Sequence, residues 1–379
     1  MRDAVIVAAV RTPIGKRNGS YADVHPVDLS AGVLREIVER TGIDPAVVDD
    51  VVWGCVQPVD AQALNVARNA VLAAGWPESV PGTTIDRQCG SSQQSAHFAA
   101  ALVVSGQADV VVAGGAEVMS LVPMGSVTRG QFGEPFGPLF GARYPETPNQ
   151  GIGAETIAAQ WRLSRQQLDE YALNSHDLAA AAIDRGAFAG QYAPVEGTGL
   201  IVDEGVRRGT TPERMASLPP AFKEGGVIHA GNSSQISDGA GALLITTSEK
   251  AARLGLRPLA RLHGFAVAGS DPVTMLTGPI PATAKVLART DLSIGDIGAF
   301  EINEAFASVP LAWLAETGAD PKRLNPLGGA IAVGHPLGGS GAILMTRLVH
   351  HMVDNGIRYG LQSMCEGGGM ANATVLELI

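Results

Sequence analysis

The stretch Thr83-Thr-Ile-Asp-Arg-Gln-Cys89-Gly-Ser-Ser-Gln-Gln-Ser-Ala-His-Phe-Ala-Ala-Ala-Leu-Val-Val104 joins two kinds of local structure. Its β-branched start predicts a short strand, and its alanine-rich continuation predicts a buried helix. Cys89 therefore falls at a strand-to-helix junction, where backbone N–H groups and the helix dipole stabilise a thiolate and lower the pKa of a thiol. A nucleophilic cysteine is made in this way. The alternative at this point is an inert buried cysteine.

Length and composition limit the class of protein. The chain has 379 residues, more than one hydrophobic core usually organises, so two or three domains are expected. Its 46% hydrophobic and 17% charged residues are typical of a tightly packed α/β protein and not of a disordered one. The net charge is −10 and no dense basic run occurs, so we expect neither nucleic acid nor an anionic membrane as a partner.

The cysteines and the termini indicate the compartment. Cys55, Cys89 and Cys365 are an odd number far apart in the sequence, which does not predict a disulfide framework and favours a reducing cytoplasm. The apolar run at the N-terminus is too short for a membrane span and no cleavage site follows it. The C-terminus lacks a Ser-Lys-Leu peroxisomal ending. We expect a cytoplasmic protein without membrane insertion.

Strand and helix signals alternate in two parts of the chain. The first part predicts strands at 5–10, 50–54 and 108–117 and helices at 29–40 and 65–74. The second part predicts strands at 257–263, 297–302 and 362–369 and helices at 305–316 and 340–354. Continuous apolar strands between helices indicate a sheet that is covered on both faces.

A segment rich in glycine and proline separates the two parts, with one helical span predicted at 153–185. Long irregular segments in compact proteins are usually functional, so we interpret this one as covering a site. We therefore predict an α/β protein with two similar halves. Residues 1–118, completed by about 237–258, form the first half, residues 119–236 the loop or covering domain, and residues 259–379 the second half.

Three polar motifs stand out in the second half. Asn303-Glu-Ala-Phe306 follows a predicted strand, at the edge where open α/β sheets place their sites. Gly334-His335-Pro places an imidazole in a glycine-rich turn. Cys365-Glu-Gly-Gly-Gly supplies a second thiol beside N–H groups that can point inward. A fourth polar, glycine-rich stretch, 229–241, ends the covering segment. Singly, each also has a structural explanation as a turn, a cap or a core residue.

Together and in this order, these motifs resemble those of the thiolases, over nearly the whole chain from Arg11-Thr-Pro13 to the C-terminal strand. The resemblance implies two like βαβαβ halves stacked as five α-β-α-β-α layers, with a loop domain inserted between them. It also implies a homodimer or homotetramer. The implied activity is that of an acyl-CoA C-acyltransferase, which cleaves a 3-ketoacyl-CoA with CoA, as in fatty acid β-oxidation, or runs the reverse Claisen condensation.

The resemblance also implies a role for each catalytic residue. Cys89 would attack the substrate carbonyl and form an S-acyl enzyme. His335 would take the thiol proton, which suits an imidazole near neutral pH. Cys365 would be the second acid and base. The enolate oxygen would be met by His335 and a water held by Asn303, and the tetrahedral oxyanion by the backbone N–H groups of Cys89 and Gly367.

The CoA contacts are implied in the same way, with acyl-CoA and CoA as substrates and no separate cofactor or metal. Ser234 matches a serine set against the pantetheine arm, and Arg207 falls where the family often has a basic residue near the adenine nucleotide. Residues that match the lining of the CoA tunnel are Leu218, Phe222, Ala305 and Phe306.

Three departures from the common pattern bear on the substrate. Asp86 stands where the family commonly has Asn, and Gln235 replaces a usual glycine. Asn149-Gln150 stands where short-chain biosynthetic members carry His-Met. The pattern looks more like that of actinobacterial catabolic thiolases, including steroid side-chain degraders, than like that of acetoacetyl-CoA enzymes.

Two other functions share features with this sequence. A 3-ketoacyl synthase shares the ancestral fold, but it would use two histidines, or His and Asn, and would lack Cys365 in its glycine box. A non-catalytic acyl-CoA or lipid carrier on a thiolase scaffold is disfavoured by the intact Cys89, Asn303, His335 and Cys365. A zinc site is disfavoured because no short-spaced pair of ligands occurs.

Overall fold

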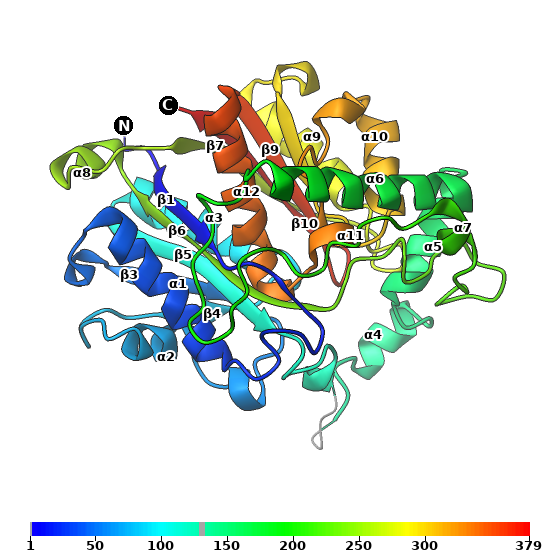
Figure 1. The fold of residues 1–379 in the computed structure, drawn as a ribbon, viewed down its shortest axis with the longest axis horizontal. Coiled ribbons are helices and arrows are strands. Elements are labelled where there is room, and N and C mark those ends of the chain that lie inside the picture. Colours follow the sequence, from blue (N-terminus) through cyan, green and yellow to red (C-terminus); the bar gives the residue numbers. More distant parts are fainter. Residues whose placement is uncertain (1, 129–132) are drawn as a thin grey trace.

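The computed structural model describes residues 2–128 and 133–379 (Figure 1). Residues 129–132 of the predicted covering domain lie outside the described residues. The elements of the first half are β1 (Val5–Arg11), β2 (Gly15–Lys16), α1 (Pro26–Thr41), β3 (Asp50–Gly54), α2 (Val66–Ala73), β4 (Thr83–Ile85), α3 (Ser91–Ser105), β5 (Val110–Val118), β6 (Ser237–Thr246) and α8 (Ser248–Arg253). Those of the second half are β7 (Ala260–Gly269), α9 (Pro279–Thr290), β8 (Ala299–Ile302), α10 (Ser308–Thr317), α11 (Ala330–Val333), α12 (Ser340–Asn355), β9 (Tyr359–Glu366) and β10 (Met370–Leu378).

The strands repeat one topology on the two sides of a central junction. Their order is β4-β3-β5-β6-β1-β7-β10-β9-β8, with β2 added to β6. Read outward from the junction, the first half runs β1-β6-β5-β3 and the second runs β7-β10-β9-β8, which confirms the prediction of two similar halves. In both halves the second and third strands of this order are antiparallel, and the third and fourth are parallel. The antiparallel β1–β7 pair joins the two β layers into one continuous sheet.

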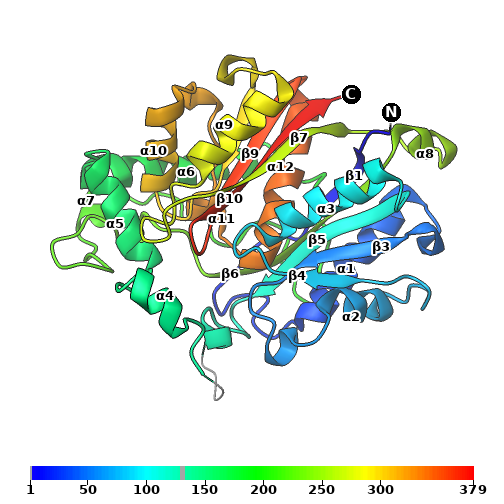
Figure 2. The same cartoon turned by 180° about the vertical axis from the view of Figure 1, so that it is seen from behind.

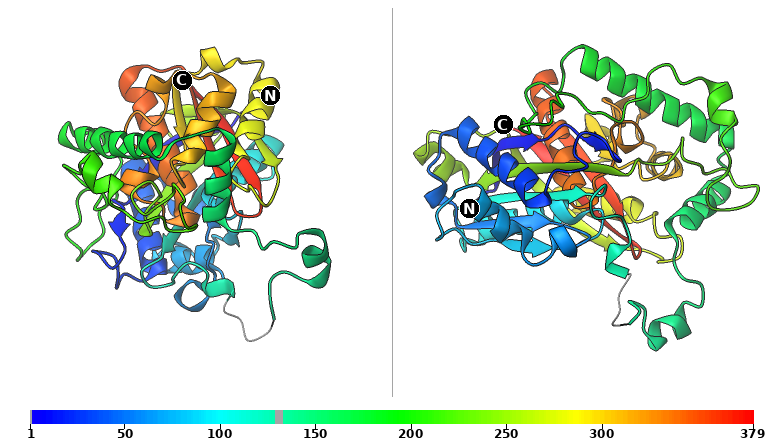
Figure 3. Two further views of the ribbon diagram at one scale, coloured as in Figure 1. Left: turned by 90° about the vertical axis from the view of Figure 1, so that its right-hand side faces the viewer. Right: turned by 60° about the horizontal axis from the view of Figure 1, so that its bottom comes forward.

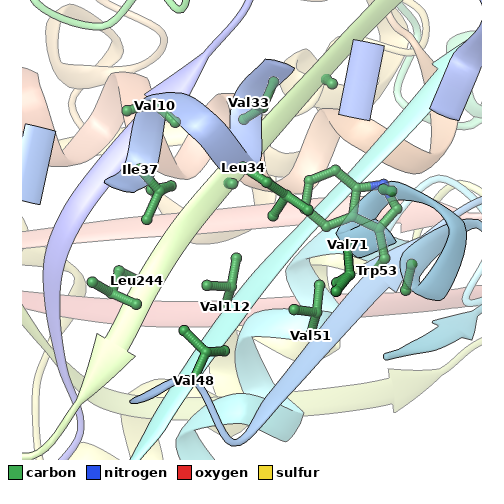
Figure 4. Packing of buried hydrophobic residues seen from close by; sticks show 14 of the residues in the cluster. Val10, Val33, Leu34, Ile37, Val48, Val51, Trp53, Val71, Val112 and Leu244 are labelled. Carbon is green, nitrogen blue, oxygen red and sulfur yellow. The ribbon is translucent and has the colours of Figure 1, made fainter. Parts of the chain in front are cut away.

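Helices cover and separate the two β layers (Figure 1, Figure 2). Figure 4 shows Val33, Leu34 and Ile37 of α1 packing toward apolar side chains of β3, β5 and β6 on the outer face of the first half. α9 and α10 pack on the outer face of the second half. A central apolar cluster contains residues of α3 and α12 together with strands from both halves. α3 and α12 are therefore the middle layer of the α-β-α-β-α arrangement.

The covering segment contains α4 (Pro138–Arg143), α5 (Gln150–Gln160), α6 (Arg165–Asp184) and α7 (Pro212–Ala216). Figure 3 shows the part with α4 extending away from the two halves. The prediction of one helical span at 153–185 is wrong, because Arg162 adopts the left-handed conformation and breaks the span. Ser164 then begins α6 with a capping box that includes Gln167.

Element boundaries in the second half also differ from the prediction. The strand predicted at 362–369 is β9, Tyr359–Glu366, and the strand predicted at 297–302 is β8, Ala299–Ile302. The strand predicted at 257–263 is β7, Ala260–Gly269, because its extent is set by pairing with β10 along its whole length. The helix predicted at 305–316 begins only at Ser308. The residues before it pair with another segment instead, since Phe306 bridges to Ser233 and the carbonyl of Ala305 accepts from the N–H of Ser234.

Candidate active site

Cys89 lies in a tight turn between β4 and α3 and is 5% exposed. The turn depends on Gln88, whose φ of 50° lies in the left-handed region, and its N–H donates to Asp86 Oδ1 at 2.6 Å. α3 begins at Ser91, so Cys89 precedes the first helical residue by two positions. The thiol is therefore fixed at the strand-to-helix junction that the sequence predicts.

His335 lies in the turn between α11 and α12, directly after Gly334, whose φ of 109° suits glycine. Its Nδ1 is 2.6 Å from Ser340 Oγ, and that hydroxyl donates its one hydrogen to the carbonyl of Pro336. Ser340 can therefore only accept from the ring, so Nδ1 carries the hydrogen and Nε2 is unprotonated and acts as an acceptor. Asn303 Nδ2 donates to this Nε2 at 3.4 Å.

Cys365 and Asn303 come to the site from neighbouring parallel strands. β8 and β9 pair in parallel with Ile302 opposite Ser363, and the N–H of Asn303 donates to the carbonyl of Ser363 at 3.0 Å. Cys365 lies near the end of β9 and is buried. The carboxyl ends of adjacent parallel strands thus deliver an amide and a thiol to one edge of the sheet.

A cavity of about 210 Å³ brings most of the predicted site together, and we refer to it as the reaction cavity. The predicted residues that line it are Cys89, Phe222, Ser234, Ala305, Phe306, His335 and Cys365. Asn303 reaches it through its bond to His335, and the backbone N–H of Gly367 lies close enough to the Cys89 sulfur to act on the pKa of that thiol. Residues from both halves and from the covering segment therefore meet at one point.

Two predicted CoA contacts lie outside the reaction cavity. Arg207 lines an adjoining cavity of about 620 Å³, which shares Ser234, Gln235 and Ile236 with the reaction cavity. Lys16, Arg17 and Glu204 line the same adjoining cavity, and Lys16 pairs with Glu204 at 3.6 Å. Its cationic side chains outnumber this one carboxylate, so the wall is basic on balance. Leu218 lines neither cavity, and its carbonyl accepts from Arg165 at 2.6 Å.

The prediction that the Cys89 thiol has a lowered pKa is wrong for this structure. Burial, together with the negative charge of Glu366, raises the pKa of Cys89 to about 12, although the N–H groups of Cys89 and Gly367 act in the opposite direction. Burial also raises the pKa of Cys365, and a charge on Cys89 would raise it more. Burial lowers the pKa of His335 to about 4. At neutral pH the site therefore holds two neutral thiols and a neutral imidazole whose Nε2 is unprotonated.

The sequence reasoning missed two groups of the site, Ser340 and Glu366. Ser340, which fixes the ring of His335, lies five residues after it and gives no signal on its own. Glu366 follows Cys365 directly, and its charge raises the pKa of both thiols. Its place in the Cys-Glu-Gly-Gly-Gly motif is a signal that could have found it.

The departure at 149–150 divides between two roles. Gln150 lines the reaction cavity, whereas Asn149 caps α5 by accepting from the N–H of Ile152. The departure at 149–150 therefore reaches the cavity through Gln150 alone.

The other two departures have structural partners. Asp86 lies close enough to Cys89 for its charge to oppose the thiolate. Gln235 Nε2 donates to the carbonyls of Gly205, Ile331 and Ala332, each at 2.9 Å, and so ties the covering segment to the second half. All three cysteines are free thiols. Within residues 2–128 and 133–379, no group of His, Cys, Asp or Glu could hold a metal ion, and no helix is long and apolar enough to cross a membrane.

A buried cysteine with a neutral imidazole and a second thiol in one cavity defines the chemistry of a thiol-dependent acyltransferase. Residues 4–249 match the family model "Thiolase, N-terminal domain", and residues 256–378 match "Thiolase, C-terminal domain". The chain belongs to the thiolase family, as its motifs predict.

Relatives and solved structures match over the full length. The chain is 50% identical to the steroid 3-ketoacyl-CoA thiolase FadA6 of Mycobacterium tuberculosis, over 100% of this chain and 94% of that one. It is 42% identical to a 3-ketoacyl-CoA thiolase of Bacillus subtilis, over 100% of both. The structure superposes with a TM-score of 0.91 on Bacillus anthracis acetyl-CoA acetyltransferase, at 39% identity, and on human mitochondrial 3-ketoacyl-CoA thiolase, at 36% identity. Each superposition covers 100% of this chain and 99% of the other. The predicted thiolase fold is thereby confirmed.

Proposed function

We propose that this protein cleaves 3-ketoacyl-CoA with CoA to give acetyl-CoA and a shortened acyl-CoA, and that it can run the reverse Claisen condensation. The observation that carries the proposal is the meeting of Cys89, His335 and Cys365 around one cavity. The full-length similarity to 3-ketoacyl-CoA thiolases supports it and does not favour a 3-ketoacyl synthase or a carrier without activity.

The first half-reaction makes the S-acyl enzyme. Cys89 Sγ attacks the 3-keto carbon while its proton passes to His335 Nε2, and the oxyanion is met by the N–H groups of Cys89 and Gly367. The C2–C3 bond then breaks, and the acetyl-CoA enolate receives a proton at C2 from Cys365. The enolate oxygen accepts from the protonated Nε2 of His335. Asn303 Oδ1 is buried without a hydrogen-bond partner in the described part of the chain, which suits it to hold a water there.

The second half-reaction returns the enzyme to its starting state. The thiol of a second CoA gives its proton to Cys365, which the first half-reaction left as a thiolate, and attacks the acyl carbon on Cys89. The bond between Cys89 and the acyl group then breaks, the acyl-CoA leaves, and Cys89 recovers its proton from His335 Nε2. The substrate's thioester arm would lie against Ser234, Ala305 and Phe306, and the basic adjoining cavity with Arg207 would receive phosphate groups. Cys89, His335, Cys365 and the CoA thioester supply all the reacting groups, so this chemistry requires no resident cofactor or metal.

We also propose a homo-oligomer, a dimer or a tetramer, in the cytoplasm. β4 lies at the edge of the sheet, where an unpaired strand is open to pairing with a second copy. Leu64, on the first half before α2, is 87% exposed, and burial against a second copy would remove this apolar surface from water. Three free cysteines fit a reducing compartment.

The identity of the nucleophile can be tested by acyl labelling. After incubation with acetoacetyl-CoA or acetyl-CoA, intact-protein mass spectrometry should show one added acetyl group per chain, on the peptide that contains Cys89. The reason is that Cys89 has both a proton acceptor and oxyanion donors in its surroundings. A label on Cys55 or Cys365 with Cys89 free would disprove the assignment.

The substrate preference should favour 3-ketoacyl chains that are longer or bulkier than acetoacetyl. Gln150 lines the reaction cavity where short-chain relatives have Met, so the acyl end of the site has a different shape and polarity. Each methylene that the cavity accepts contributes up to about 0.8 kcal/mol. We expect kcat/KM for thiolysis to rise along a C4-to-C12 series and to remain high for a steroid thioester.

The matched variant for this prediction is Gln150→Met. It should shift the ratio of kcat/KM values toward acetoacetyl-CoA, whereas a substitution at Asn149, whose side chain caps α5, should act on stability instead. A steep fall in the wild-type kcat/KM after C4 would show that other residues close the cavity.

A further inference from the structure

Glu366 is a buried carboxyl next to both reactive thiols, and the mechanism above does not use it. It follows Cys365 at the end of β9 and is 1% exposed. Neither of its carboxyl oxygens has a hydrogen-bond partner among the described residues. An ionised carboxylate in such surroundings is strongly disfavoured, so a neutral acid fits the site better.

Gly90, next to Cys89, leaves room for the Glu366 carboxyl because it has no side chain. A Cβ on Gly90 would overlap Glu366 Oε1 and would lie 2.8 Å from Asn372 Oδ1. Both oxygens therefore lie against the Cys89–Gly90 turn. Asn372 Oδ1 also lacks a donor among the described residues, while its Nδ2 faces His97 Nδ1 at 3.1 Å. These neighbouring oxygens are all acceptors, and a proton on Glu366 would supply a donor among them.

The charged and titratable groups around Glu366 come from every neighbouring element. Burial raises the pKa of Glu366 to about 8. The charge of Arg87 and the nearby backbone N–H of Asn372 act against this shift, and the charge of Asp86 acts with it. Cys89 and Cys365 are the thiols whose pKa values its charge raises. His97 on α3, which faces Asn372, has its pKa lowered to about 3 by burial and is neutral. Arg87 is therefore the single cation in this set.

We propose that Glu366 is a positioning residue that acts through Cys89: it remains protonated while the Cys89 thiolate forms, and its ionisation opposes that thiolate and limits the reaction at high pH. The two groups then titrate as a coupled pair, in which each charge disfavours the other. This inference rests on the proposed role of Cys89 as nucleophile.

The test is the pH dependence of Cys89 alkylation in the full-length protein. The rate of modification by iodoacetamide, mapped by mass spectrometry to the Cys89 peptide, is measured from pH 6 to 10.5 in the wild type and in Glu366→Gln. In the wild type the logarithm of the rate should rise, flatten near pH 8 and rise again. In Glu366→Gln it should rise without a break, equal to the wild type at pH 7 and about tenfold faster at pH 9.5, which corresponds to one unit of thiol pKa.

Asp86→Asn is the matched control, because it removes the other carboxylate near the thiol. It should keep the break, at a somewhat lower pH than the wild type, because the charge of Asp86 helps to raise the pKa of Glu366. Identical wild-type and Glu366→Gln profiles, or loss of the break in Asp86→Asn alone, would overturn the proposal. If Glu366→Gln does not fold, the wild-type profile decides, since a single ionisation contradicts the proposal. Alkylation does not need turnover, so failure of the acyl-labelling experiment would disprove the nucleophile assignment without deciding this one.

Discussion

Replacing Cys365 with alanine should lower kcat/KM for thiolysis of a 3-ketoacyl-CoA by about 10³-fold, which is within the range of general acid–base catalysis. Acetyl transfer from acetyl-CoA to Cys89 should remain measurable. The two effects separate because breaking the C2–C3 bond requires a proton donor at C2, whereas acylation from a thioester breaks no carbon–carbon bond and needs no proton at carbon. Cys365 lines the reaction cavity from the end of β9 and is well placed to be that donor.

Two measurements check this expectation: the steady-state rate of thiolysis, and the extent of acetylation seen by intact-protein mass spectrometry. Cys55→Ala is the matched control. Cys55 is also a buried thiol, but its sulfur is 3.9 Å from Glu117 Oε1 and it does not line the reaction cavity. This variant should keep thiolysis close to the wild-type rate. Near-normal thiolysis in Cys365→Ala would remove the second acid and base from the mechanism.

Local signals explain why so much of the fold could be predicted. Gly42 ends α1 in the left-handed conformation, with φ of 66°, and Asn65 caps α2 by accepting from the N–H of Arg68. Such signals act within a few residues and are visible in the sequence. The extent of β7 was mispredicted because it depends on β10, which lies at the far end of the chain. The break between α5 and α6 was missed although Ser164 and Gln167 form a recognisable capping box.

In the site, as in the fold, the features that depend on local sequence could be predicted and those that depend on distant residues could not. The motifs around Cys89, His335 and Cys365 identify the reacting side chains, because each is a short run whose residue types suit the chemistry. The protonation state of Cys89 could not be predicted, since it depends on burial by elements of both halves and on Glu366 from the second half. A helix start alone favours a thiolate, but here desolvation outweighs it. The thiol must therefore be deprotonated during attack, which makes the base decisive.

Replacing His335 with alanine should consequently impair both half-reactions severely, unlike Cys365→Ala. We expect kcat/KM to fall by about 10³-fold or more for thiolysis, because proton transfer alone contributes up to about 10⁴-fold and the oxyanion donor is lost with the same ring. Acetylation of Cys89 from acetyl-CoA should also become slow.

Since burial lowers the pKa of His335 to about 4, the imidazole is neutral above that pH. The acid limb of the wild-type kcat/KM profile should therefore lie near pH 4 and not near 6.5.

Ser340→Ala tests the contribution of the His335 tautomer separately from that of the imidazole itself. It leaves the imidazole in place but removes the oxygen that accepts from Nδ1 at 2.6 Å, so the hydrogen is no longer confined to that nitrogen. Rates of thiolysis should fall less than in His335→Ala, by about 10- to 100-fold, in line with the loss of an orienting partner.

Acetylation of Cys89 at the wild-type rate in a folded His335→Ala protein would show that another group takes the thiol proton. Both thiols are neutral, and among the described residues that line the reaction cavity His335 is the one histidine. No second imidazole is therefore in place among these residues to take the proton.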